Sequence, residues 1–178
     1  GTLMTDPAGI NPITVSVIQH RLSAIVEEMG EAMLRTSYSQ ILNSSRDFST
    51  AICGAAGPLI AQAGHIPVHI GALSWAVIAL VDYFGDDVHP GDVFLLNDPY
   101  FGGSHLPDMT LYKPVFFEDE LLFWTVNRSH MNETGGPVAG GYNPLAEEIW
   151  AEGICISPVK LYDGGEPRND VIDLLMTN

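Results

Sequence analysis

Basic residues are scarce in this sequence. Its 178 residues include 7 Lys and Arg against 22 Asp and Glu, which gives a formal net charge of −15. A surface this acidic repels phosphate backbones and anionic headgroups, so binding to nucleic acids or to membrane surfaces is not expected. Charged residues make up only 16% of the chain, against about a quarter in a typical globular domain. This low share suggests that a partner or further chain covers part of the surface.

Cysteines and long apolar runs are few as well. Cys53 and Cys155 lie far apart, with no CxxC or other metal-type spacing, and are interpreted as buried thiols in a reducing compartment, the cytoplasm. The best apolar run, residues 70–81, contains Gly71 and Ser74 and is too short to span a bilayer. No basic and apolar leader opens the chain, so no signal peptide is expected.

Common catalytic signatures are also missing. The sequence contains no GxSxG, GxxxxGK[ST] or HExxH motif and no dinucleotide-binding fingerprint. Lys113 and Lys160 are its only lysines, so few lysine side chains are available to bind the phosphates of a nucleoside triphosphate. If the protein uses ATP, we expect another polypeptide or a further segment to bind it.

The apolar pattern predicts an α/β fold of the α+β type, with antiparallel β-hairpins packed against two helices. Asn11 and Pro12 are typical of a helix start, and apolar residues at steps of three and four predict an amphipathic helix to about Tyr38. A second, buried helix is expected from Ile70 to Phe84. Turn residues separate the other expected elements: strands at 48–53, 59–63, 93–96, 109–117, 121–126 and 154–161, and helical pieces at 147–151 and 170–178.

One predicted hairpin brings an imidazole and a carboxylate together. If its loop is residues 118–120, then Phe117 pairs with Leu121, and the same register places Asp108 opposite His130. Directly opposed residues share a face of the sheet, with Cβ atoms about 5 Å apart. The prediction depends on this register, because a two-residue loop or a bulge would turn His130 to the other face.

Two further candidates are expected at the open end of the same hairpin. His105 would lie at the level of Glu133, just beyond the strand ends. Imidazoles and carboxylates at this separation are typical ligands of a divalent transition metal. The alternative is that Asp108 merely begins a strand and that His130 is a hydrogen-bonded core histidine. His65 and His69, which flank Pro67, are interpreted as lining a substrate site or as structural.

Several segments resemble, in order, the hydantoinase B family, which includes the B subunits of ATP-dependent N-methylhydantoinases, oxoprolinases and caprolactamase and the homologous subunits of acetone and acetophenone carboxylases. The resemblance is strongest in residues 97–108 (NDPYFGGSHLPD), which look like the family signature. It extends to residues 44–49, 61–71, 148–153 and 158–161. Residues 6–178 are therefore expected to be the N-terminal region of a larger B-type subunit, and residues 1–5 a cloning scar or disordered.

The resemblance also implies a ligand set. In the family, a divalent metal is held by positions that correspond to His105, Asp108 and His130, with Asp47 as a further ligand. Zinc or manganese is expected, with iron as an alternative. Many relatives have a second His and an Asp where this chain has Met131 and Glu133, so their roles do not carry over directly. Glu133 and Asp47 are the candidates for proton transfer.

The resemblance further implies a division of labour in a hetero-oligomer. An A-type subunit binds ATP and phosphorylates the small-molecule substrate, and the B-type subunit opens a hydantoin, lactam or oxoproline-like ring at its metal. Three alternatives stay open: a subunit of an ATP-dependent ketone carboxylase, a non-catalytic scaffold fragment, and an iron oxygenase with two His and one carboxylate. The oxygenase is disfavoured because such sites usually use HxD spacing, whereas two residues separate His105 from Asp108.

Overall fold

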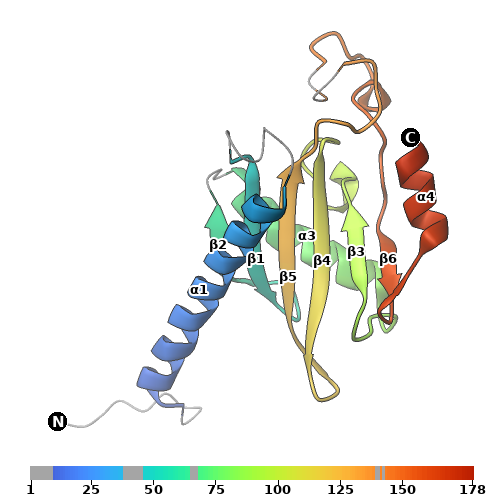
Figure 1. The fold of residues 1–178 in the computed structure, drawn as a ribbon. Helices are drawn as coiled ribbons and strands as arrows, with labels where there is room; N and C mark the ends of the chain where they lie inside the picture. The colour runs from blue at the N-terminus through green and yellow to red at the C-terminus, as the bar shows by residue number, and fades with distance from the viewer. Residues whose placement is uncertain (1–9, 38–45, 65–67, 139–140, 142) are drawn as a thin grey trace.

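The computed structural model describes residues 10–37, 46–64, 68–138, 141 and 143–178, which form one antiparallel sheet with three helices (Figure 1). The strands are β1 (Phe48–Gly54), β2 (Leu59–Gly64), β3 (Val93–Leu96), β4 (Asp108–Phe117), β5 (Glu120–His130), β6 (Val159–Asp163) and β7 (Glu166–Pro167). The helices are α1 (Pro12–Thr36), α3 (Val68–Phe84) and α4 (Asn169–Thr177), with 3-10 turns η1 (Pro99–Phe101) and η2 (Ile149–Ala151). The strand order is β2-β1-β5-β4-β3-β6-β7. This confirms the α+β class, and in the described residues the third helix, α4, forms where the C-terminal helical piece was expected.

Helix α3 covers one face of the sheet and contributes to the main core. The residues of this core are almost fully buried, and they are Ala51, Cys53, Leu73, Ala76, Val77, Leu80, Phe94, Leu96, Tyr112, Trp124 and Val126. On β5 they occur at every second position, as expected for a strand with one face against the core. Burial raises the pKa of the Cys53 thiol to about 11, so this thiol stays protonated near neutral pH.

Helices α1 and α4 lie on the opposite face, toward its two edges (Figure 1). Helix α1 begins as expected, because the Asn11 side chain accepts a hydrogen bond from the Ile13 amide and Pro12 occupies the first turn. Only its second half packs on the sheet, around Val26. Val15 and Ile18, which the periodicity assigns to the packed stripe, are 39% and 51% exposed.

The chain around β6 differs from the expectation. A strand was expected over 154–161, but regular pairing begins only at Val159, because the preceding residues bond instead to the side chain of Asn97. Helix α3 begins at Val68 rather than Ile70. Residues 1–5 and His65 lie outside the described residues, and the His69 side chain is not described either. No helix in the described ranges is both long and apolar enough to cross a membrane.

Lys160 on β6 is a buried cation that pairs with one buried and two exposed carboxylates at the edge of the core. Its Nζ lies 2.8 Å from Asp87 Oδ1, 3.2 Å from Asp92 Oδ2 and 3.5 Å from Asp163 Oδ1. Burial lowers the pKa of the Lys160 amino group, but hydrogen bonds to Asp87 and Asp92 outweigh burial and raise it overall. Since Asp92 is fully buried, Lys160 is the counter-charge that keeps this carboxylate from being isolated.

We expect Lys160→Met to lower the free energy of unfolding by about 3–5 kcal/mol, because it leaves the Asp92 carboxylate buried without its partner. Urea denaturation measures the change. Arg168→Met is the matched control, since it removes a cation that pairs with Asp170 at the surface, and it should change the stability far less. Equal losses in the two variants would contradict this role for Lys160.

Candidate metal centre

The pairing of β4 with β5 brings Asp108 opposite His130. The predicted pair is therefore confirmed, although the predicted loop is wrong. The hairpin turn has two residues, Glu118 and Asp119, and a bulge leaves Leu122 without a partner on β4. The shorter turn or the bulge alone would place His130 on the opposite face from Asp108. Together their effects cancel, so the predicted pairing holds beyond the bulge.

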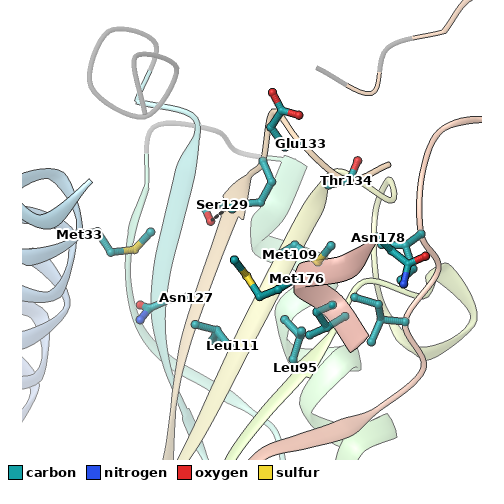
Figure 2. Close-up of a pocket in the computed structure, with 14 residues that line it drawn as sticks. Met33, Leu95, Met109, Leu111, Asn127, Ser129, Glu133, Thr134, Met176 and Asn178 are labelled. Carbon is teal, nitrogen blue, oxygen red and sulfur yellow. Dashed lines mark hydrogen bonds between the residues drawn. The ribbon is translucent and has the colours of Figure 1, made fainter. Parts of the chain in front are cut away.

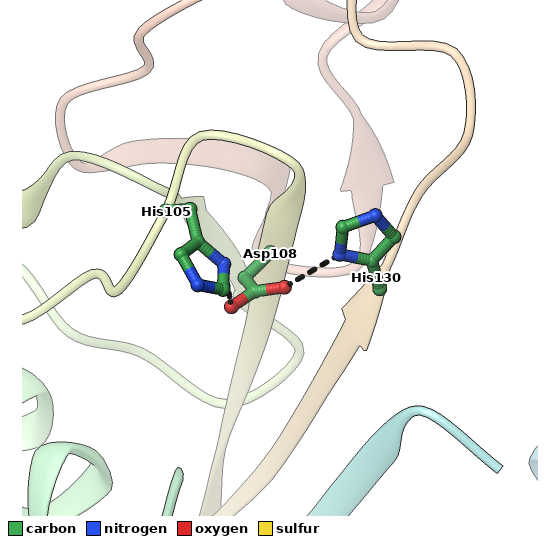
Figure 3. Close-up of side chains that lie close together, drawn as sticks. All are labelled: His105, Asp108 and His130. Atoms are coloured by element: carbon green, nitrogen blue, oxygen red, sulfur yellow. Dashed lines mark hydrogen bonds and ion pairs between the residues drawn. The ribbon is translucent and has the colours of Figure 1, made fainter. Parts of the chain in front are cut away.

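His105 joins this pair from the loop before β4, so that the carboxylate lies between two imidazoles (Figure 3). His105 Nδ1 lies 2.8 Å from Asp108 Oδ2, and His130 Nδ1 lies 3.1 Å from Asp108 Oδ1. The Ser104 hydroxyl also donates to Asp108 Oδ2. The Asp108 side chain is 1% exposed, that of His130 18% and that of His105 64%. The centre is thus buried at its carboxylate and open at His105.

The loop before His105 is built on two buried polar residues. Asn97 donates from Nδ2 to the carbonyls of Leu106 (2.7 Å) and Ile154 (2.8 Å) and accepts from the Ile156 amide (2.6 Å). The Asp98 carboxylate accepts from the Tyr100 amide and so caps η1. These bonds satisfy polar groups that burial would otherwise penalise, and they fix both ends of the loop.

Two glycines let this loop pack closely against its neighbours. Gly102 has a φ of +88°, and a Cβ there would lie 2.5 Å from the Cα of Ala76 on α3. A Cβ on Gly103 would lie 2.1 Å from the carbonyl oxygen of Asn97. The close approach that the lack of a side chain permits at both glycines is between backbone and backbone.

Asp47 lies immediately before β1, beside His130. Its carbonyl accepts a hydrogen bond of 3.1 Å from the His130 amide, which continues the β1–β5 pairing past Phe48 and Ser129. Asp47 therefore stands opposite His130 in the register. Asp47 is half-buried, and it does not belong to the cluster formed by His105, Asp108 and His130.

Glu133 lies outside the three-residue cluster and lines a separate cavity (Figure 2). This cavity of about 350 Å³ lies between α1 and α4, and its walls include Met33, Met109 and Met176. Met109 lies next to Asp108 on β4 and therefore points to the other face of the sheet. The cavity and the cluster thus occupy opposite faces near the same end of the hairpin.

The donor atoms of the cluster suit a divalent transition metal. One potential ligand atom from each of His105, Asp108 and His130 lies within 4.8 Å of the others. Two imidazoles and one carboxylate are ligands that zinc, manganese and iron accept. The carboxylate also contacts both imidazoles directly, so the three side chains already converge on one small volume.

Two residues at this site were missed by sequence reasoning. Ser104 bonds to Asp108, and Arg128 is a fully buried cation two residues before His130. Arg128 carried a signal: on β5 it falls at the same alternate positions as Trp124 and Val126, which face the core. A charged residue at an inward position is unusual enough to mark a specific role.

The fold and the cluster define an α+β protein with a candidate centre of two histidines and one carboxylate. The sequence profile of the hydantoinase B/oxoprolinase family matches residues 11–178, so the chain belongs to this family.

Individual relatives agree with this assignment. Caprolactamase subunit beta of Pseudomonas jessenii is 44% identical over 169 residues, which are 95% of this chain and 29% of that protein. The 5-oxoprolinase PfmaA of Pestalotiopsis fici is 39% identical over 163 residues, 92% of this chain and 13% of that protein. The chain therefore spans less than a third of each of these relatives.

Solved structures show the same fold. The crystal structure of ATP-dependent caprolactamase from Pseudomonas jessenii superimposes with a TM-score of 0.87 at 44% identity, over 94% of this chain and 29% of that chain. The nucleotide-free structure of acetone carboxylase superimposes with a TM-score of 0.84 at 23% identity, over 94% of this chain and 22% of that chain. At that identity the second likeness concerns the fold alone.

We expect Asp108→Asn to weaken zinc binding at least about 100-fold, because it removes the only carboxylate of the cluster while keeping the size of the side chain. Titration against a chromophoric chelator measures the affinity. Asp119→Asn, in the exposed hairpin turn, is the matched control and should bind zinc like the parent. Unchanged affinity in the Asp108 variant would place the ligands elsewhere.

Proposed function

We propose that this chain holds a divalent metal ion through His105, Asp108 and His130 and serves an enzyme that opens a cyclic amide at the expense of ATP. The convergence of these three side chains is the observation that carries the proposal. The names of the relatives support the reaction class, since they are a caprolactamase subunit and a 5-oxoprolinase. Zinc or manganese is the proposed metal, with iron as the alternative.

The residues around the cluster would hold its ligands in place. Asp108 contacts both imidazole rings and accepts from Ser104, so its carboxylate is fixed from three directions. Such contacts orient the ligand groups before an ion binds. A divalent ion held there would polarise an activated carbonyl group and so favour attack by water.

We assign the use of ATP to a partner, the A-type subunit. Of the two lysines, Lys160 is paired with the carboxylates around it, and Lys113 lies exposed on β4, at a position that alternates to the face opposite Asp108. In the proposed reaction the partner transfers the γ-phosphoryl group of ATP to the amide oxygen. Water then adds to the activated carbon at this chain's site, and the ring C–N bond breaks to give a free amine and an acyl phosphate. A second water hydrolyses the acyl phosphate to the carboxylate and free phosphate. A hetero-oligomer follows from this division.

The test is an assay of the protein purified with its native partners, supplied with ATP, magnesium and either 5-oxoproline, a lactam or a hydantoin. We expect one of these rings to open with formation of ADP and phosphate, and the activity to disappear in the Asp108→Asn variant. Ring opening without ATP would contradict the proposal. Consumption of a ketone that depends on bicarbonate, with no amide cleavage, would identify a carboxylase instead, and bound metal absent under every condition would favour a scaffold.

We propose Asp47 as a further ligand, and Asp47 and Glu133 as candidates for proton transfer, Glu133 from outside the three-residue cluster. Asp47→Asn should weaken metal binding about tenfold or more, because Asp47 stands beside His130. Glu133→Gln should leave metal content unchanged and lower kcat about 100-fold. Elemental analysis and steady-state kinetics separate the two effects. Full activity in Glu133→Gln would exclude Glu133 as the proton-transfer group. That result would fit its position at the cavity on the other face of the sheet.

A further inference from the structure

Arg128 is a buried cation beside the cluster that no step of the proposed reaction uses. It is 0% exposed and pairs with Thr110 across the β4–β5 ladder, one step inward from the pair of Asp108 and His130. Positions two residues apart on a strand point to the same face. The guanidinium therefore lies on the same face as the candidate ligands.

The guanidinium ties three parts of the chain together. Its Nε donates to Thr110 Oγ1 at 2.8 Å, and its Nη2 donates to the carbonyl oxygen of Gly102 at 2.8 Å. No carboxylate lies within ion-pair distance of Arg128 in the described part of the chain. Burying such a charge without a counter-ion is costly, so its benefit must come from the bonds that it makes.

The bond to Gly102 anchors the loop that ends in His105. On its other side this loop lies against Ala76 of α3, with no room for a side chain at Gly102. Gly102, within loop 98–105, is thus in contact with α3 and bonded to the guanidinium. His105 itself has a largely exposed side chain that contacts Asp108, so its place depends on where the loop holds its backbone.

We propose that Arg128 is a positioning residue that holds loop 98–105 so that His105 reaches the same ion as Asp108 and His130. The inference rests on the proposed metal centre. The planar fork of arginine suits this task, because it donates in two fixed directions at once. A lysine keeps the charge but cannot reproduce both bonds in that geometry.

The first test needs no metal. Arg128→Lys should speed amide hydrogen exchange in the peptide that covers residues 98–105 by at least about tenfold, because the Gly102 carbonyl loses its donor. Exchange in β1 should stay unchanged. Arg168→Lys is the matched control, since it makes the same replacement at an exposed ion pair. Unchanged exchange in the loop overturns the proposal, whether or not the protein binds metal.

The second test asks whether Arg128 acts through His105. Zinc and manganese affinities are measured for the parent, Arg128→Lys, His105→Ala and the double variant. We expect Arg128→Lys to weaken binding about tenfold in the parent but less than about twofold when His105 is already absent. Equal losses in both backgrounds would show that Arg128 acts on the whole centre, and would overturn the proposal. A parent that binds neither ion would refute the metal centre itself.

Thr110→Val is a second variant in case Arg128→Lys does not fold. It removes the acceptor for Arg128 Nε and leaves the bond to Gly102 in place. We expect the same faster exchange in residues 98–105 and the same coupling to His105, both smaller in size. If loop exchange and metal affinity are unchanged in this variant, the anchoring of the guanidinium does not govern the loop.

Discussion

The pairing of β4 with β5 is the constraint on which the rest of the structure depends. This long ladder sets which residues face α3 and which face the cavity between α1 and α4. Because side chains alternate along a strand, a slip of one residue between the two strands would reverse the faces of one strand relative to the other. Asp108 and His130 would then lie on opposite faces of the sheet, and one of the two strands would turn its apolar residues away from α3. The apolar core and the candidate metal centre thus share one register.

The site needs more than the ladder, because His105 comes from a loop. That loop is fixed at its start by Asn97, whose amide bonds tie it to the segment before β6. Near its end it is held through Gly102, between Ala76 of α3 and Arg128 of β5. Contacts distant in sequence therefore decide where a residue only three positions before Asp108 comes to lie.

These contacts explain which features of the structure could be predicted from the sequence. The pairing of Asp108 with His130 was predictable, because alternation and turn residues bracket the two strands, yet the turn and the bulge were not. Their effects on register cancel, so the right pair followed from a wrong loop. The roles of Asn97, Arg128 and Lys160 could not be predicted, since each depends on partners distant in sequence. The helix start at Asn11 was predictable because its capping contacts are local.

The side chains of the cluster differ in exposure, and this difference is relevant to whether a metal site there would be structural or catalytic. Structural metal sites are usually closed by four protein ligands, whereas catalytic sites keep a position open. Here the carboxylate of Asp108 is buried and the outermost candidate ligand, His105, is largely exposed, so the open side is the one held by the loop. Asp47 stands at the opposite side, next to His130. If Asp47 supplied a fourth ligand, it would do so from the β1 side of His130, and the exposed side at His105 would stay free for a substrate that arrives from solvent.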